Sequence, residues 1–255
     1  MDAFKWWRNH KKAFLAILVV IAVSFLANLN TTTTMGINYQ TEKYSIPIYL
    51  KVLNFFDRHY NYQYLVKEIT KNDESDKDKA IQLATWVNHN IKKIPKGVDM
   101  VDNHPWTIVQ RLFGAPDQFS DLLSVLMVYA DIDSFFRFID MEEMANVYGY
   151  EFYPLTFFLV DGSWSVTDPY QGVYFVNEDG AFASLSDIKE GRWKVVYYGS
   201  MEFNSELLAR FYPKLFSQLP SEEEISRSHI YERGGRANIQ NPTGRLLYQL
   251  HKVLE

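Results

Sequence analysis

Thiol chemistry is excluded in this chain, because none of its 255 residues is a cysteine. Catalysis by a thiolate and metal sites built on cysteine both need that side chain. The histidines are scattered, with neither the short spacing of a metal site nor an HExxH string. They are His10, His59, His89, His104, His229 and His251. The sequence therefore predicts no metal site and no cofactor.

Carboxylates and hydroxyls are the remaining candidates for chemistry. Asp117 follows Pro116 at the start of an apolar helical segment, and Asp168 lies at the end of a strand-like run, just before a proline. Two carboxyl groups about 5 to 9.5 Å apart across an open cleft could act on a glycosidic bond. An enzyme that uses these two carboxylates on glycans or peptides is therefore the alternative to a non-catalytic protein. Ser120 and Ser124 lie in the same helical segment without a nearby histidine to accept a proton, so we expect neither to be a nucleophile.

Four segments with apolar residues at helical spacing must position these side chains. They are residues 46–69 (one or two helices), 75–93, 105–113 and 117–130. Ser75 and Asp78 form a capping-box-like start for the second helix. Pro116 is expected as the N-cap or first residue of the last helix, where Asp117 is favourable against the helix dipole.

After residue 130 the apolar pattern changes to a period of about two, which is typical of strands. The runs are residues 134–140, 152–160, 164–167, 173–176 and 193–198. Asp161 and Gly162 predict a type I′ hairpin between two of them. Helices followed by strands predict an α+β domain in which helices pack on one face of a mostly antiparallel sheet.

The N-terminus predicts a membrane anchor. Four basic residues between Lys5 and Lys12 precede an apolar run over residues 13–29. At 1.5 Å per residue this run covers about 25 Å, close to the roughly 30 Å of a bilayer core. The positive-inside rule then keeps the N-terminus in the cytoplasm and places the remainder on the periplasmic or extracellular side. A signal peptide cleaved near Ala27 is the alternative, and it too exports the domain.

The overall composition limits the class of protein. A formal net charge of -5 argues against nucleic acid, whose binding needs clustered Lys and Arg. The length and the 47% hydrophobic content fit one soluble domain. Residues 31–34 predict a polar tether, and residues 220–241 predict an extended surface segment or a partly disordered one. A short C-terminal helix with an apolar stripe, which includes Leu246 and Leu250, docks on the domain or binds a partner helix.

Three motifs occur in a fixed order along the middle of the chain. They are WVNHNI (Trp86 to Ile91), the segment from Pro105 to Asp133 with its PDQF string, and VDGSWSVTDP (Val160 to Pro169). Over residues 75–198, roughly half of the chain, this order resembles the transglutaminase-like domain, a bacterial branch of the papain-like superfamily. The resemblance implies a papain-like fold with a nucleophilic cysteine at the start of a central helix, a histidine opening a strand, and an aspartate before a proline.

On that pattern the catalytic triad is degenerate. Pro116 falls at the nucleophile, Tyr153 at or near the histidine, and only the aspartate, Asp168, is kept. This chemistry needs a thiolate, a base and a group that orients the base, so we expect a pseudoenzyme. We expect the hydroxyl of Tyr153 to bond Asp168 or backbone, Asp168 to close a turn, and Asp117 to cap its helix.

The expected function is a non-catalytic binding or scaffold subunit on the outer side of a membrane. The resemblance implies a role in bacterial cell-envelope or exopolysaccharide synthesis or export, with a protein partner in a membrane-associated complex or a polysaccharide. Candidate ligand-binding residues are Trp106, Asp117, Tyr153, Trp164 and Tyr170. A third possibility is a structural subunit whose anchor helix makes the important contacts. The expected divisions are a basic cytoplasmic tail (1–12), a transmembrane anchor (13–29), the transglutaminase-like domain (30–220) and a C-terminal tail with a short amphipathic helix (221–255).

Overall fold

The structure is a computed structural model that describes most of the chain. The described residues are 3–37, 40–70, 75–94, 98, 104–140, 151–199, 205–227, 242–246 and 250. They form the predicted α+β fold, with an N-terminal apolar helix and a five-stranded antiparallel sheet.

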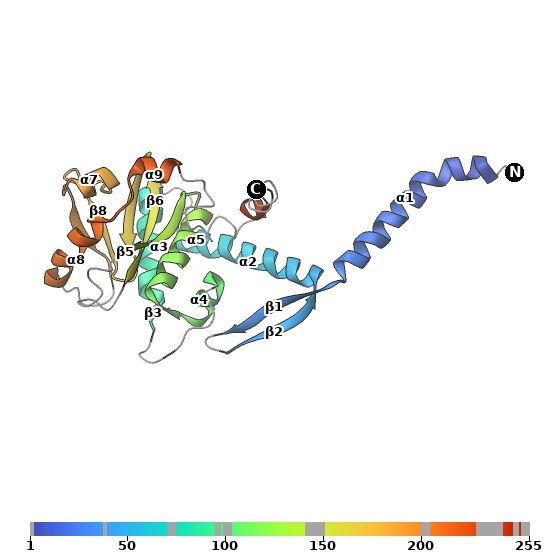
Figure 1. Cartoon of the computed structure of the whole chain (residues 1–255), viewed down its shortest axis with the longest axis horizontal. Coiled ribbons are helices and arrows are strands. Elements are labelled where there is room, and N and C mark those ends of the chain that lie inside the picture. Colours follow the sequence, from blue (N-terminus) through green and yellow to red (C-terminus); the bar gives the residue numbers. More distant parts are fainter. Residues whose placement is uncertain are drawn as a thin grey trace.

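Helix α1 (Ala3–Ala27) projects away from the remainder of the molecule, as Figure 1 shows. Its stretch from His10 to Ala27 is long and apolar enough to cross a membrane, and none of that stretch is buried. A signal sequence near an N-terminus has the same length and composition. The helix begins at Ala3, so the basic segment before residue 13 continues the same helix.

A β-hairpin follows α1, where the sequence predicted a polar tether over residues 31–34. Strands β1 (Asn30–Ile37) and β2 (Gln40–Pro47) pair in an antiparallel register that places Thr33 opposite Tyr44. The tether prediction was wrong because β-branched threonines favour extended, paired backbone, although their side chains are polar. The hairpin brings the chain back to the end of α1, where the N–H of Ile48 donates to the carbonyl of Leu29 at 2.9 Å.

Four helices on one side of the sheet agree closely with their predicted ranges. They are α2 (Ile48–Ile69), α3 (Asp76–Asn90), α4 (Pro105–Arg111) and α5 (Pro116–Tyr129). The hydroxyl of Ser75 accepts the N–H of Asp78 at 3.1 Å, which confirms the predicted cap of α3. Residues 46–69 contain one helix, not two.

The main sheet is a meander. Its strands are β5 (Ser134–Asp140), β6 (Phe152–Val160), β7 (Ser163–Asp168), β8 (Val173–Val176) and β9 (Lys194–Tyr197), each paired antiparallel with the next. Asp161 and Gly162 both have positive φ, 53° and 78°, as the predicted type I′ turn requires. A short parallel pair, β3 (Lys92–Lys93) and β4 (Phe113–Gly114), joins the ends of α3 and α4.

Helices cover both faces of this sheet, not one as the sequence predicted. Phe158 and Val160 pack with α2 to α5, whereas Leu155 and Phe157 pack in a second core. That second core is closed by α7 (Leu185–Lys189), α8 (Ser205–Ser217) and α9 (Glu222–Arg227). The one-face prediction failed because β6 is apolar on both of its alternating faces, so each face has to be buried.

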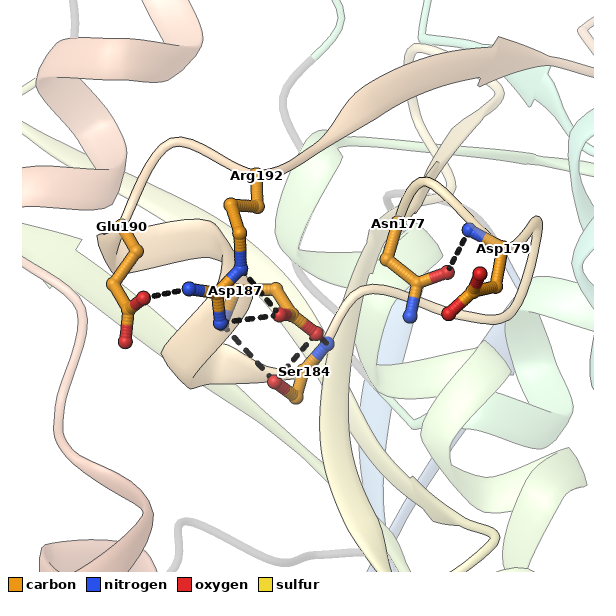
Figure 2. A network of polar contacts seen from close by, with 6 residues as sticks. All are labelled: Asn177, Asp179, Ser184, Asp187, Glu190 and Arg192. Carbon is orange, nitrogen blue, oxygen red and sulfur yellow. Dashed lines mark hydrogen bonds and ion pairs between the residues drawn. The ribbon is translucent and has the colours of Figure 1, made fainter.

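The segment around α7 is held by its own polar contacts, which Figure 2 shows. Ser184 and Asp187 form a capping box, and Arg192 bonds Asp187 at 2.9 Å and also Glu190. In the preceding turn the side chain of Asn177 accepts the N–H of Asp179 at 3.1 Å. These contacts fix the local shape of residues 177–192, and the buried Leu185 and Ile188 pack α7 against the sheet.

The C-terminal part differs in two places from its sequence-based description. The segment expected to be extended from residue 220 begins with α9, whose Ile225 is buried against the sheet. In the C-terminal helix Leu246 and Leu250 are 61% and 51% exposed. These two leucines are therefore not docked on the domain. Residues 228–241 and 251–255 lie outside the described residues.

Candidate functional site

The N-terminus of α5 is where the resemblance places a nucleophile. The chain enters it from Leu112, which has a left-handed φ of 60°, and Pro116 is the first residue of the helix. The N–H of the first residue in a helix has no partner within the helix, so a proline, which lacks this N–H, fits there without loss. Proline also has no atom that could act as a nucleophile. Gln118 closes the helix end, since its side-chain oxygen accepts the N–H of Ala115 at 3.0 Å and the guanidinium of Arg111 at 2.6 Å. Proline thus occupies the position that the resemblance assigns to a nucleophile, with a buried glutamine–arginine pair behind it.

Asp168 ends strand β7 and has no exposed surface. Its Oδ2 atom accepts the hydroxyls of Tyr153 at 2.8 Å and Tyr212 at 2.9 Å, and its Oδ1 atom accepts the N–H of Gln171 at 3.0 Å. The predicted bond from Tyr153 and the predicted turn-closing bond are both confirmed. Burial raises the pKa of Asp168, although these hydrogen bonds and the charge of Lys93 act in the opposite direction.

Tyr153 and the start of α5 belong to the same region, but the tyrosine side chain points away from the helix. Strand β6 runs beside α5, where Thr156 donates to the carbonyl of Ser120 at 3.2 Å and Ser120 donates to the carbonyl of Pro154 at 3.4 Å. Side chains alternate along a strand, so Pro154 and Thr156 share the α5 face and Tyr153 lies on the other. There the ring of Tyr153 packs edge-on against Phe211 at 5.0 Å. The residue of β6 that faces α5 at this level is Pro154, which cannot accept a proton either.

The two serines of α5 are engaged with backbone. Ser120 donates to Pro154, and Ser124 donates to the carbonyl of Asp121 at 2.8 Å, both in fully buried positions. Three of the described histidines make contacts elsewhere: His59 with the hydroxyl of Tyr129, His89 with the carbonyl of Tyr198, and His104 with the N–H of Trp106. Within the described ranges no group of three or more histidine, aspartate or glutamate side chains could hold a metal ion.

The five predicted ligand-binding residues are divided between the two faces of the sheet. Trp164 is buried in the core under α8, edge-on to Phe135, together with Tyr153. Trp106 is half-buried on the opposite side, edge-on to Tyr62 at 5.0 Å. The two tryptophans therefore do not line one pocket.

Asp117 and Tyr170 are both located at the first turns of α5, Asp117 within the helix and Tyr170 packed on it. Asp117 is half-buried in the first turn of the helix, and the ring of Tyr170 packs edge-on against Phe119 at 5.2 Å. The ammonium of Lys93 lies 4.2 Å from the centre of the Tyr170 ring, a cation–π contact. The first turns of α5 thus involve two members of the predicted set, one in the helix and one packed on Phe119.

Two residues that the sequence reasoning missed hold this region in place. Tyr212 lies 44 positions after Asp168 and reaches it from α8. Asn88 of α3 donates to the carbonyl of Pro169 at 2.8 Å in a buried position and so ties that helix to the turn after β7. Asn88 belongs to the WVNHNI motif, but no local pattern indicates the bonding partner of either residue, because each acts on a segment far away in the sequence.

Comparisons with known proteins give distant likenesses. No family model and no curated protein matches this chain. Among solved structures, a protein of Cytophaga hutchinsonii provisionally named as a cysteine protease matches with a TM-score of 0.37 and 14% identity, over 54% of this chain and 46% of the other. A protein of Parabacteroides distasonis provisionally named as a protease matches with a TM-score of 0.36 and 12% identity, over 68% and 39% of the two chains. The chain spans less than half the length of each, and scores this low carry no argument about its reaction.

Proposed function

We propose that this chain is a non-catalytic, transglutaminase-like domain that serves as a binding or scaffold subunit on the outer side of a membrane. Membership of that family is itself part of the proposal and rests on the order of the sequence motifs. The element order supports it, since a central helix that begins at Pro116 is followed by antiparallel strands that bring Tyr153 and Asp168 together.

The enclosure of Asp168 is the observation that carries the proposal. A catalytic aspartate of a triad has to orient an imidazole, and this one accepts bonds from Tyr153, Tyr212 and Gln171 instead. The same enclosure argues against the carboxylate enzyme that uses Asp117 and Asp168, because glycoside hydrolysis needs both carboxyl groups open to the substrate.

The apolar stretch of α1 and the basic residues in the first turns of the same helix support the membrane location. Basic residues precede the apolar stretch that ends at Ala27, which favours a cytoplasmic N-terminus and an exported domain. The resemblance adds the context of cell-envelope or exopolysaccharide synthesis or export. In that setting the subunit would bind a membrane-associated protein partner or the polysaccharide.

Affinity purification of the full-length chain from its native membranes tests the scaffold role. We expect a protein of glycan assembly to co-purify, and we expect the purified chain to turn over neither peptide nor glycan libraries. Asp168→Asn and Asp117→Asn are the matched variants, with circular dichroism to establish that each is folded. Turnover by the unaltered chain that disappears in folded Asp168→Asn would refute the proposal.

A further inference from the structure

The first turns of α2 form an apolar surface that the folded domain leaves uncovered. Residues 48–56 read IYLKVLNFF, in which only Lys51 and Asn54 are polar. Large apolar side chains point in all directions around this part of the helix and are 37% to 58% exposed. They are Ile48, Tyr49, Leu50, Val52, Leu53 and Phe56, which we call the α2 apolar surface. A helix that is apolar on all sides is not stable against water, so something must cover it.

The α2 apolar surface begins where the membrane helix ends. The N–H of Ile48 donates to the carbonyl of Leu29, two residues beyond Ala27, the last residue of α1. The ammonium of Lys51 donates to the carbonyl of Thr32 at 3.0 Å, which holds the helix to the hairpin. In Figure 1 the start of α2 lies at the junction of α1 with the hairpin, and only the later part of α2 enters the folded domain.

Only the second half of α2 packs against the domain. Tyr62 and Val66 are buried, and the ring of Tyr62 stacks on Tyr129 of α5 at 5.0 Å. The described contacts of the first half involve α1 and the hairpin. This half is therefore placed between the membrane helix and the domain.

We infer that the α2 apolar surface is buried in the headgroup and upper acyl region of the same bilayer that α1 crosses. The segment 48–56 that carries this surface has nine residues and covers about 13 Å, and amphipathic helices at a bilayer surface bury their apolar side about 5–10 Å deep. Tyrosine is enriched at this depth, where Tyr49 and the exposed Tyr44 of β2 would lie. The ammonium of Lys51 is bonded to the carbonyl of Thr32, so its charge is held at the hairpin and the stem of the side chain adds apolar surface to this part of the helix.

The inference rests on the proposed membrane anchoring by α1 and deepens it. Two successive attachments, one across the bilayer and one in its surface, would fix both the height and the direction of the domain. Since α2 is one helix of 22 residues, its immersed start and its domain-bound end move as one body.

The absence of cysteine allows a direct test on the full-length chain. Single cysteines carrying a nitroxide are placed at Val19 of α1, at Val52 and Leu53 of α2, and at the exposed Gln63 further along α2 as the matched control. In liposomes, collisions of each label with oxygen, which partitions into lipid, are compared with collisions with a water-soluble nickel complex. We expect labels at Val52 and Leu53 to meet nickel several-fold less often than the label at Gln63, and to meet oxygen more often.

The positions separate the possible failures. If the label at Val19 meets nickel freely, the anchoring by α1 is wrong. If Val19 is in lipid but Val52 and Leu53 meet nickel as often as Gln63 does, only the present inference is wrong. Labels at Val52 and Leu53 that are shielded from both reagents would mean that a second copy of the chain covers this surface, which also overturns it.

Discussion

Two tyrosine hydroxyls satisfy one oxygen of a carboxylate that lies fully inside the protein. Tyr153 and Tyr212 approach Oδ2 of Asp168 from β6 and from α8, so the aspartate joins a strand to a helix that is distant in sequence. A buried carboxylate without such donors would cost much more free energy than one that is fully bonded. The site that resembles a catalytic triad therefore has a structural role as a polar link within the second core.

Removing one of these donors should destabilise the fold in a pH-dependent way. In Tyr153→Phe we expect a loss of about 1–3 kcal/mol in the free energy of unfolding. The pKa of Asp168 is higher in the folded protein than in the unfolded chain. Its contribution to stability is therefore fully present at a pH below the unfolded pKa. This contribution is lost as the pH rises through the folded pKa. Loss of the Tyr153 bond raises the folded pKa further. The deficit should therefore be larger at about pH 8 than at about pH 5.

Denaturant unfolding at the two pH values measures this effect. Tyr64→Phe, at a tyrosine that is 66% exposed, is the control and should be neutral. A deficit of Tyr153→Phe that does not change with pH would contradict the account of Asp168.

A cysteine at the start of α5 should be reactive without making an enzyme. In Pro116→Cys the helix N-terminus should lower the pKa of the thiol, so that it alkylates faster than a cysteine placed at the exposed Glu178. No turnover of peptides is expected, because the residue of β6 that faces the start of α5 is Pro154, which cannot act as a base. Adding Pro154→His should lower the thiol pKa further, whereas adding Tyr153→His should not, since residue 153 faces the other core. Rates of iodoacetamide labelling against pH measure this, and an equal effect of the two histidines would disprove the assignment of faces.

At the residue scale the sequence predicted the partners of Asp168 only in part. The bond from Tyr153 could be predicted because a short strand pair and a DG turn bring the two residues together. Tyr212 could not, because nothing near it marks which face of the sheet α8 would cover. Successive residues of a strand face opposite sides of the sheet, so a shift of one position reverses the face. The resemblance placed the histidine at or near Tyr153, and this does not decide the face on which Tyr153 lies.

The turn between β7 and β8 is the element on which this arrangement depends. Gly172 has a φ of +71°, and a Cβ added there would lie 2.5 Å from the Cα of Gly199. Asn88 supports the same turn through the carbonyl of Pro169. The backbones of two segments thus pass too closely for any side chain at this glycine.

Gly172→Ala should therefore lower the free energy of unfolding more than the same substitution at a glycine without close neighbours. Gly180→Ala is the matched control, since Gly180 has a φ of +77° with nothing within 4 Å of the added Cβ. We expect the control to lose about 1–2 kcal/mol from the left-handed backbone alone, and Gly172→Ala to lose clearly more. Thermal unfolding of both variants measures the difference, and equal midpoints would show that the close approach is unimportant.

Elements whose signals are local could be predicted from the sequence. The bounds of β5, β6 and β8 and the cap of α3 at Ser75 agree with the structure, because alternation, turn residues and caps act over a few positions. The hairpin of β1 and β2 was missed because threonine is both polar and a good strand former. The helices α8 and α9 were missed because they cover the second face of the sheet. Which segments cover that face depends on how all the strands pair, and no local pattern shows this.

For the whole molecule, the orientation in the membrane is open to direct measurement. In intact cells a membrane-impermeant maleimide should label Glu178→Cys and should not label His10→Cys. The reason is that the basic residues before the apolar stretch favour the cytoplasmic side. The unaltered chain, which has no cysteine, is the background control. Labelling of His10→Cys alone would reverse the proposed topology.

The hairpin returns the chain to the point from which it departed, since Asn30 pairs with Pro47 and Ile48 bonds Leu29. Its length therefore adds nothing to the distance between the end of α1 and the domain. Removing a matched pair of opposed residues, such as Thr33 with Tyr44, would shorten the loop yet leave the exit of α1 and the entry of α2 in contact. The hairpin can thus vary in length and composition without changing where the domain sits relative to α1.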